Sequence, residues 1–526
     1  MADTTVDEQR DALRAWVQRR EPGREIDLAE THISILAFAG DRVFKVKKAV
    51  AYPFVDLSTR ELRRRQCERE VSLNRRLARD VYLGVVPLDD ASGRVVDHLV
   101  EMVRMPGDCR LAARAAGGPD PTACLDRVAD AIARFHRSAP TGGVIDASST
   151  REAVADLWDR NLAELAPHTK SILERASVER VAALAHVFIA GRGDLFDARV
   201  AAGRARDGHG DLLADDIFCT ADGPRILDCL EFDDHLRYGD VLADVAFLAM
   251  DLERLGRADL ARHFLERYRE QTGDAWPESL EHLYVASRAI VRAKVACLRA
   301  ESGAPDTADA ARGLLGLAKA HLETGRVRIV LVGGAPGTGK TTLARMIARE
   351  LHLPVLHSDE VRKELAGLAP TARGQAAVDA GIYTAEWDAR TYEALCRFAA
   401  GHLRRGVSVV LDASWADPVR RGEAANLARA TASEVNAFRC SVAPAVATAR
   451  ASARALVGTD ASDVAGDLAR TLGARFAEWP EASVVDTEAA PDVVAASVIA
   501  ALRTRHGTNG LPGSGSFTLG AEGRES

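Results

Sequence analysis

Residues 334–341 form a glycine-rich segment between an apolar run at 327–332 and a helical pattern at 342–351. In a strand, glycine-rich turn and helix of this kind, backbone amides point at phosphate oxygens. The lysine reaches the β- and γ-phosphates, and the hydroxyl that follows it ligates Mg²⁺. The sequence therefore predicts a nucleotide site made of Gly334, Ala335, Pro336, Gly337, Thr338, Gly339, Lys340, Thr341 and Thr342.

A second group of chemically capable residues begins at His209-Gly210-Asp211. Asp216 lies five residues after Asp211, and an apolar run at 225–227 ends in Asp228. Phosphoryl transfer needs one carboxylate that orients and deprotonates the acceptor hydroxyl, and others that hold Mg²⁺ against the nucleotide. A solvated turn is also rich in aspartate, but the ordered spacing favours Asp211 as the base and Asp216 and Asp228 as metal ligands.

A nucleotide site of this second kind also needs a lysine on a strand and a glutamate on the next helix, which together clamp the α- and β-phosphates. Lysine is scarce in this chain, yet Lys45 falls in an alternating apolar segment. We predict that Lys45 pairs with Glu70. Lys47 lies on the same strand face and Glu68 is near Glu70, so either one is an alternative partner.

Further candidates follow the glycine-rich segment. Asp359 follows the strand pattern at 355–357, and Asp412 follows the apolar run at 407–411. Because carboxyl ends of parallel strands face the ligand crevice, we expect Asp359 to orient an acceptor hydroxyl and Asp412 to hold Mg²⁺. A helix cap or surface turn is the simpler alternative for each. Arginine stabilises the charge on a transferring phosphate, so a helical segment is predicted to close over it with Arg450 and Arg454.

A chain of 526 residues is too long for one core and should hold two to four domains. The first hundred residues combine helical patterns with alternating strands, including a hairpin pattern at 33–46 that turns at Gly40, and helices then dominate. From residue 326, strands and helices alternate, which predicts a parallel α/β sheet. We expect a kinase-like domain at 1–306, a linker helix at 307–325, a P-loop domain at 326–506 and a disordered tail at 507–526.

The amino-acid composition indicates which classes of binding partner and which compartment to expect. The net charge of −7 argues against a dedicated non-specific nucleic-acid binder and favours a small polar acceptor. The eight cysteines are scattered and imply no disulfide framework or zinc site. No apolar run approaches the ~18 residues of a membrane span. A cytoplasmic protein that does not bind membranes is therefore expected.

His209-Gly210-Asp211-Leu212 with Asp228 resembles the catalytic and metal-binding loops of the aminoglycoside phosphotransferase and choline kinase-like family, over about 25–300. The resemblance implies a bilobal protein-kinase-like fold, of α+β class, with ATP in its cleft. Asp216 departs from the asparagine usual in that family. Residues 326–500 resemble small P-loop kinases of the parallel α/β class. The order of the two parts resembles bacterial fusions described as bifunctional aminoglycoside phosphotransferase and ATP-binding proteins.

The sequence thus predicts an ATP- and Mg²⁺-dependent phosphotransferase with two nucleotide sites, acting on hydroxyls of small molecules such as sugars, amino sugars or nucleosides. Two alternatives stay open. In one, the kinase-like part is degenerate, and an ATP-dependent regulatory or binding protein keeps only the P-loop part active. In the other, the P-loop part phosphorylates nucleic-acid ends, which the acidic composition disfavours. The acceptors and the oligomeric state are not specified by the sequence.

Overall fold

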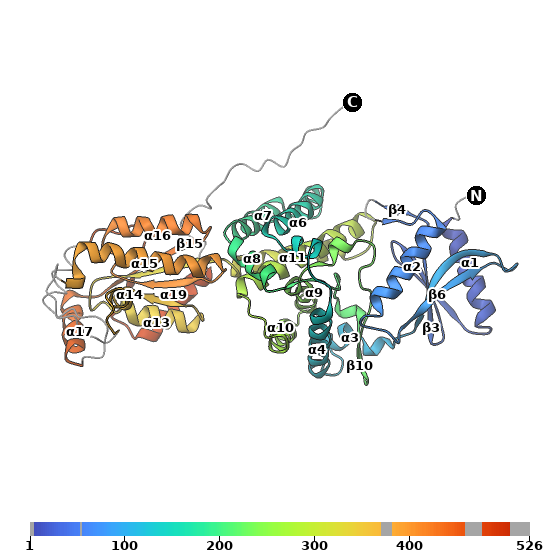
Figure 1. The fold of residues 1–526 in the computed structure, drawn as a ribbon, viewed down its shortest axis with the longest axis horizontal. Coiled ribbons are helices and arrows are strands. Elements are labelled where there is room, and N and C mark those ends of the chain that lie inside the picture. The colour runs from blue at the N-terminus through green and yellow to red at the C-terminus, as the bar shows by residue number, and fades with distance from the viewer. Residues whose placement is uncertain (1–4, 53–54, 370–380, 458–475, 505–526) are drawn as a thin grey trace, which may run out of the picture. The chain divides into compact units, whose positions relative to one another are not determined.

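The computed structural model of the chain describes residues 5–52, 55–369, 381–457 and 476–504 (Figure 1). Contacts divide the chain into two units. The first unit comprises Met1–Val154, Ala198–Ala275 and Tyr284–Leu317, and the second comprises Ala155–Asp197, Trp276–Leu283 and Ala318–Ser526. The sequence-derived domain bounds stay a prediction.

A five-stranded antiparallel sheet of order β1-β2-β3-β7-β6 opens the first unit. Its strands are β1 (Ile26–Glu30), β2 (Ser34–Ala39), β3 (Arg42–Lys47), β6 (Tyr82–Asp89) and β7 (Val95–Val103). A small separate hairpin consists of β4 (Ala51–Tyr52) and β5 (Val55–Asp56).

Alternation along β3 determines what each face of this sheet contacts. Phe44 and Val46 join the core formed with helix α1 (Val6–Arg20), whereas Val43 joins the core formed with helix α2 (Arg60–Asn74). Lys45 shares the face of Val43, so its side chain points toward α2.

Helices follow the sheet. They are α3 (Leu111–Ala115), α4 (Thr122–Ser138), α5 (Val144–Ala147), α6 (Arg151–Leu165), α7 (Arg175–Ala190), α8 (Gly193–Ala201), α9 (Val241–Arg254), α10 (Ala258–Thr272), α11 (Glu278–Glu301) and α12 (Thr307–Thr324). Between α8 and α9 lie β8 (Ala205–Asp207), β9 (Ile217–Thr220), β10 (Gly223–Ile226) and β11 (Tyr238–Asp240). Strands β9 and β10 form an antiparallel hairpin, and β8 pairs with β11. The hairpin begins directly after Asp216 and ends just before Asp228.

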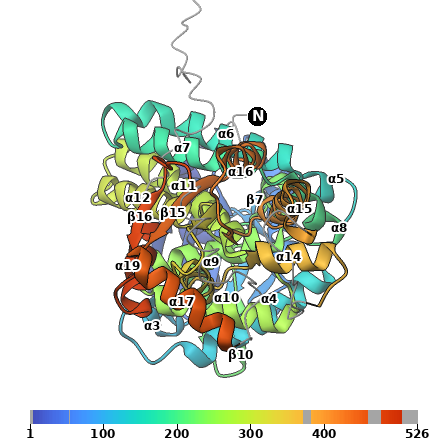
Figure 2. The same cartoon turned by 90° about the vertical axis from the view of Figure 1, so that its left-hand side faces the viewer.

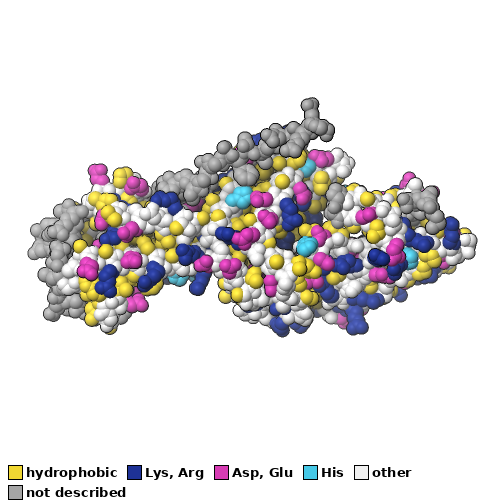
Figure 3. Space-filling view, turned by 45° about the horizontal axis from the view of Figure 1, so that its top comes forward, with side chains coloured by type: hydrophobic (Ala, Val, Ile, Leu, Met, Phe, Trp, Pro, Cys, Tyr) yellow, Lys and Arg dark blue, Asp and Glu magenta, His cyan; other side chains and the backbone are white. Residues whose placement is uncertain are grey.

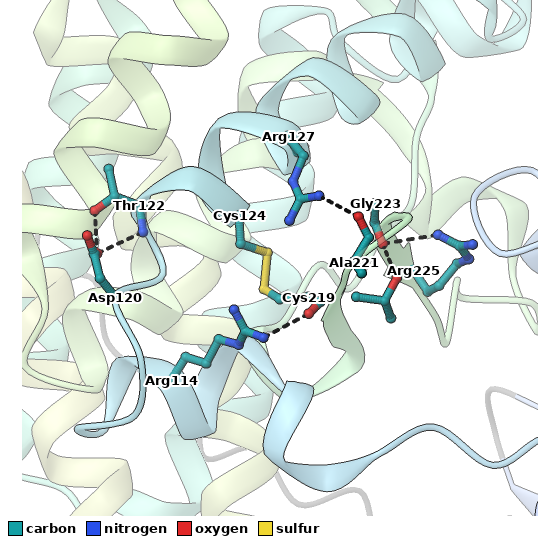
Figure 4. Close-up of a disulfide and its surroundings, with 10 residues drawn as sticks. Arg114, Asp120, Thr122, Cys124, Arg127, Cys219, Ala221, Gly223 and Arg225 are labelled. Atoms are coloured by element: carbon teal, nitrogen blue, oxygen red, sulfur yellow. Dashed lines mark hydrogen bonds between the residues drawn. A yellow bond between two sulfur atoms is a disulfide. The ribbon is translucent and has the colours of Figure 1, made fainter.

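One disulfide joins Cys124 on α4 to Cys219 on β9 (Figure 4). Arg114 donates to the carbonyl of Cys219 at 2.9 Å, and Arg127 donates to the carbonyl of Ala221 at 3.1 Å. The sequence implied no disulfide framework, and that expectation was wrong for this pair. The two cysteines are 95 residues apart, so only the packing of α4 against the hairpin brings them together.

A five-stranded parallel sheet of order β13-β14-β12-β15-β16 forms the centre of the second unit. Its strands are β12 (Arg328–Gly333), β13 (Val355–His357), β14 (Val409–Asp412), β15 (Glu434–Ser441) and β16 (Ser483–Asp486). After β12 the described helices are α13 (Lys340–Glu350), α14 (Ser358–Leu365), α15 (Ala385–Arg404), α16 (Pro418–Ala430), α17 (Pro444–Val457) and α19 (Pro491–Thr504). Helices α13 and α19 lie on one face of the sheet and α15 and α16 on the other (Figures 1 and 2).

The predicted fold class, with α+β and parallel α/β parts, is confirmed by this architecture. The hairpin predicted at 33–46 is β2 and β3, and α12 lies where the linker helix was expected. Strand β1 was not predicted. The tail at 507–526 lies outside the described residues.

Basic and acidic side chains occur side by side over much of the face drawn in Figure 3. This mixture agrees with the modest net charge of −7. In the described part of the chain, no helix is long and apolar enough to cross a membrane. Nor do three or more His, Cys, Asp or Glu residues among those described gather into a metal-binding group.

Candidate nucleotide and phosphotransfer sites

The lysine and glutamate predicted to clamp phosphates lie in contact in the first unit. Lys45 Nζ donates to Glu70 Oε1 at 2.8 Å and to Asp228 Oδ1 at 3.2 Å. Burial disfavours the ammonium, but the Asp228 and Glu70 carboxylates outweigh it and raise the pKa of Lys45 well above its usual value. Strand β3, helix α2 and the segment after β10 thus meet at one lysine.

The two alternative residues for this clamp, Lys47 and Glu68, make their ion pairs with residues other than Asp228. Lys47 is fully buried, with Nζ 2.6 Å from Glu70 Oε2 and a further ion pair to Glu231. Glu68 pairs with Arg64 on the surface of α2. Lys45 is therefore the lysine that faces Asp228, and Lys47 supports Glu70 from the interior. That Lys45 and Glu70 hold phosphates stays a prediction.

The loop that carries Asp211 is anchored by Asp244 on α9. Asp244 accepts hydrogen bonds from the backbone amides of His209 and Gly210, each at 2.8 Å, and its Oδ2 lies 2.9 Å from His136 Nε2. Burial favours the neutral acid, but these hydrogen bonds hold the pKa of Asp244 well below its usual range. His136 also contacts the Tyr268 hydroxyl at 2.8 Å, so the anchor reaches α10.

Replacing Asp244 by alanine is expected to lower the free energy of unfolding by about 3–5 kcal/mol, the usual cost of removing one partner of a buried charged network. The two loop amides would be left buried and unpaired. Urea denaturation of the full chain measures the loss. Asp259→Ala is the matched control, because Asp259 pairs with Arg257 at the surface, and its urea denaturation curve should stay close to that of the parent. An Asp244→Ala loss as small as the control's would contradict this account.

Asp211 lies beside an arginine of α11. Its side chain is 29% exposed, and its Oδ2 is 3.7 Å from a guanidinium nitrogen of Arg292 on α11. Burial raises the pKa of Asp211 to about 6, against the opposing charge of Arg292. A carboxylate with a pKa near working pH is suited to accept a proton from a hydroxyl.

Asp216 and Asp228 flank the β9-β10 hairpin. Burial, with the charges of Asp228 and Asp211, raises the pKa of Asp216 well above its usual value. Lys45 lowers the pKa of Asp228. Asp228 has a φ of 62°, a left-handed conformation that aspartate tolerates better than most residues. The crowding of like charges around Asp216 is what a divalent cation would relieve, so the donor set fits Mg²⁺, which prefers oxygen ligands.

The glycine-rich segment of the second unit has backbone conformations and close contacts that favour glycine at two positions. Gly334 and Gly337 adopt φ values of 145° and 86°, and a Cβ at Gly337 would lie 2.1 Å from the Ala447 carbonyl oxygen. The Thr338 hydroxyl donates to the Ala335 carbonyl at 2.8 Å. Helix α13 begins at Lys340, so its N-terminus faces the loop.

The two predicted acidic residues of the second unit lie at the carboxyl ends of neighbouring strands β13 and β14. His357 Nδ1 lies 2.8 Å from Asp412 Oδ2, while Asp412 Oδ1 is buried and has no hydrogen-bond partner among the described residues. Burial opposes ionisation, but His357 and Lys340 lower the pKa of Asp412. An ionised, buried and unsatisfied oxygen near Thr341 fits a Mg²⁺ ligand.

Burial raises the pKa of Asp359, and the charges of Lys340 and Arg362 oppose that shift. Asp359 therefore lies in the electrostatic reach of the loop lysine. Arg362 donates to Asp388 at 2.6 Å, which places it beside α15. That Asp359 orients an acceptor hydroxyl stays a prediction.

The predicted lid arginines are on α17. Arg450 donates two hydrogen bonds of 3.1 Å to the carbonyl of Thr487. The Thr487 hydroxyl donates to the carbonyl of Thr338, so Arg450 is one residue removed from the phosphate loop. The side chain of Arg454 lies outside the described part of the structure.

Sequence reasoning missed three residues that shape these sites: Arg292, Glu231 and His357. His357 directly precedes Ser358 at a strand end, and a histidine one strand away from a predicted metal ligand is a readable signal. Arg292 and Glu231 gave no such signal, because only the folded chain brings them to Asp211 and Lys47.

The chain is similar in sequence to known proteins. The family model described as AAA domain matches residues 329–479, which contain the glycine-rich segment, Asp359 and Asp412. A Mycobacterium tuberculosis protein, "Uncharacterized protein Rv2004c", is 42% identical over 463 residues, covering 88% of this chain and 92% of its own.

Two solved structures are similar to parts of the chain. A choline/ethanolamine kinase family protein from Mesorhizobium loti is 17% identical, with a TM-score of 0.40, over 60% of this chain and 94% of its own. A putative kinase from Chloroflexus aurantiacus is 21% identical, with a TM-score of 0.28, over 34% of this chain and 96% of its own. The match to the family model thus falls within the part of the chain that the sequence predicted to be a P-loop domain.

Proposed function

This chain belongs to the family of the mycobacterial protein Rv2004c, and we propose that it is an ATP- and Mg²⁺-dependent phosphotransferase with two nucleotide sites. Both sites are proposed to act on hydroxyl groups of small molecules. One observation supports the proposal most strongly. In each part of the chain a lysine lies among acidic residues, and those acidic residues are suited to separate roles. Lys45 accompanies Asp211, Asp216 and Asp228, and Lys340 accompanies Asp359 and Asp412.

In the first unit, Asp211 would accept the proton of the acceptor hydroxyl as its oxygen attacks the γ-phosphorus. The bond between that phosphorus and the bridging oxygen of ADP then breaks, and ADP leaves. Lys45, held by Glu70, would neutralise phosphate charge. Asp216 and Asp228 would hold Mg²⁺, which when bound offsets the charge of the phosphates.

In the second unit, the backbone N–H groups of the glycine-rich segment, which Pro336 lacks, and the side chain of Lys340 would hold the β- and γ-phosphates. Thr341 and Asp412 would hold Mg²⁺, with His357 keeping Asp412 in place. Asp359 would act as the base, and Arg450 would approach the transferring phosphate through a change in its contact with Thr487.

A second candidate rests on Asp216. A carboxylate in this position adds negative charge beside Asp211 and Asp228, and that charge opposes a nucleotide unless metal offsets it. In this candidate, the kinase-like part binds a ligand without transferring phosphate, and the P-loop part alone is active.

Calorimetric titration of the intact chain with Mg-ATP distinguishes the two. The proposal expects two sites. Lys340→Ala should abolish only the P-loop site, because it removes the lysine of the phosphate loop. Asp228→Ala should abolish only the other site, because it removes a metal ligand and the partner of Lys45.

Asp222→Ala, an exposed change in the turn of the same β9-β10 hairpin, is the control and should keep both sites. A single site that disappears in Lys340→Ala and survives Asp228→Ala would refute the two-site proposal and favour the second candidate.

A further inference from the structure

The acceptor side of the first site carries positive charge. Arg292 approaches Asp211 at 3.7 Å, which is longer than a hydrogen bond, and it makes no hydrogen bond to another described residue. Its side chain is 25% exposed. A guanidinium so placed has several N–H donors left for a ligand that lies against Asp211.

A second arginine lies one helical turn before it. Arg288 Nε donates to the carbonyl of Ala243 at 2.9 Å, and its guanidinium packs over the Phe247 ring at 4.5 Å. Residues four apart share one helix face, so Arg288 and Arg292 present positive charge on the same side of α11. Both charges act on the Asp211 carboxylate.

Three acidic residues near Asp211 have other partners or proposed roles. Asp251 is buried, where it accepts from the Ala214 amide at 3.0 Å and pairs with Arg254 at 2.7 Å. Asp216 and Asp228 are the proposed metal ligands. A positively charged acceptor that lies against Asp211 would therefore be repelled by Arg292, whose guanidinium is 3.7 Å from that carboxylate.

We propose that the acceptor of the kinase-like part is an anion, a hydroxyl compound bearing a carboxylate or phosphate group that Arg292 binds while its hydroxyl contacts Asp211. This inference rests on the proposed phosphotransfer at Asp211. Arginine is suited to the role because its planar N–H groups match both carboxylate and phosphate oxygens. The reacting hydroxyl lies within a few bonds of the acidic group, since Arg292 and Asp211 are close together.

The test uses the full chain carrying Lys340→Ala, which silences the P-loop site. Release of ADP is measured with four compounds of one three-carbon skeleton: glycerol, glycerate, glycerol 3-phosphate and 3-amino-1,2-propanediol. Glycerate or glycerol 3-phosphate should be used with a kcat/KM at least tenfold above the neutral and cationic compounds. Which of the two is preferred identifies a carboxylate or a phosphate as the recognised group.

Arg292→Gln should remove this preference, raising the KM of the anionic compound about tenfold or more, with the Kd of Mg-ATP unchanged. Arg299→Gln, an exposed position on the same helix, is the matched control and should behave as the parent. A second measurement does not need turnover: with Mg-ADP present, the anionic compounds should raise the melting temperature more than glycerol does, and Arg292→Gln should abolish the difference.

A preference for the neutral or cationic compound overturns the inference while leaving the phosphotransfer proposal intact, provided that turnover requires Asp211. Absence of an Arg292-dependent preference in both measurements also overturns it. If Arg292→Gln instead weakens the binding of Mg-ATP, the arginine contacts the nucleotide, and the proposed role toward the acceptor is wrong. If the parent chain, which carries only Lys340→Ala, binds no Mg-ATP at this site, the phosphotransfer proposal itself is wrong.

Discussion

Asp211→Asn is expected to lower kcat for transfer by the kinase-like part roughly 10²- to 10⁴-fold, the usual contribution of a general base. Asparagine keeps the size of the side chain and its ability to hold a hydroxyl, but it cannot accept the proton. The Kd of Mg-ATP should stay within about twofold, because Lys45 and Asp228 are untouched. The measurement is ADP release with the P-loop site silenced by Lys340→Ala.

The pH dependence of the same reaction gives an independent check. Burial raises the pKa of Asp211 to about 6, and the base works only when ionised. kcat/KM should therefore fall as the pH drops through about 6, with a slope of one proton. Asp215→Asn, an exposed neighbour in the same loop, should keep both the rate and this acid limb. A normal rate in Asp211→Asn would rule out the assigned role.

The second large effect is expected at Asp359. Asp359→Asn should lower kcat of the P-loop part by roughly 10²- to 10⁴-fold, again because a base is lost. Asp211→Asn is the background that isolates this site, and Mg-ATP titration should still report binding at the loop. The neighbouring Glu360→Gln is the matched control, since Glu360 lies at the surface with a loose pair to Arg345.

If Asp359→Asn and Glu360→Gln transfer phosphate equally well, Asp359 is not the base. A loss of nucleotide affinity in Asp359→Asn, without a loss of kcat, would instead assign Asp359 to Mg²⁺. The two outcomes separate a role toward the acceptor from a role toward the metal.

Local patterns made much of the fold predictable. The hairpin of β2 and β3 follows from alternating apolar residues around Gly40, and the parallel sheet follows from strands that alternate with helices after residue 326. The contact of Lys45 with Glu70 agrees with the predicted pair because strand alternation and helix position both point to α2. The roles of both residues still need the experiments above.

The remaining features depend on contacts between distant parts of the chain. Lys47 meets Glu231 across 184 residues, and Cys124 meets Cys219 across 95. No spacing rule specifies such pairs, because they arise from the packing of whole elements. Arg292 is a similar case: its helix pattern is ordinary, and only the fold brings it to Asp211.

The double pairing of Glu70 has a consequence for how this family can diverge. Because Glu70 contacts both Lys45 and Lys47, a mutation at Lys45 leaves Glu70 paired with Lys47 in the interior. Lineages can thus lose the lysine that faces Asp228 while keeping the buried ion pairs that hold α2 against the sheet. If Lys45 has the proposed role toward phosphate, one substitution at position 45 would give a folded but inactive first unit, and that position is where a search among relatives should look for such chains.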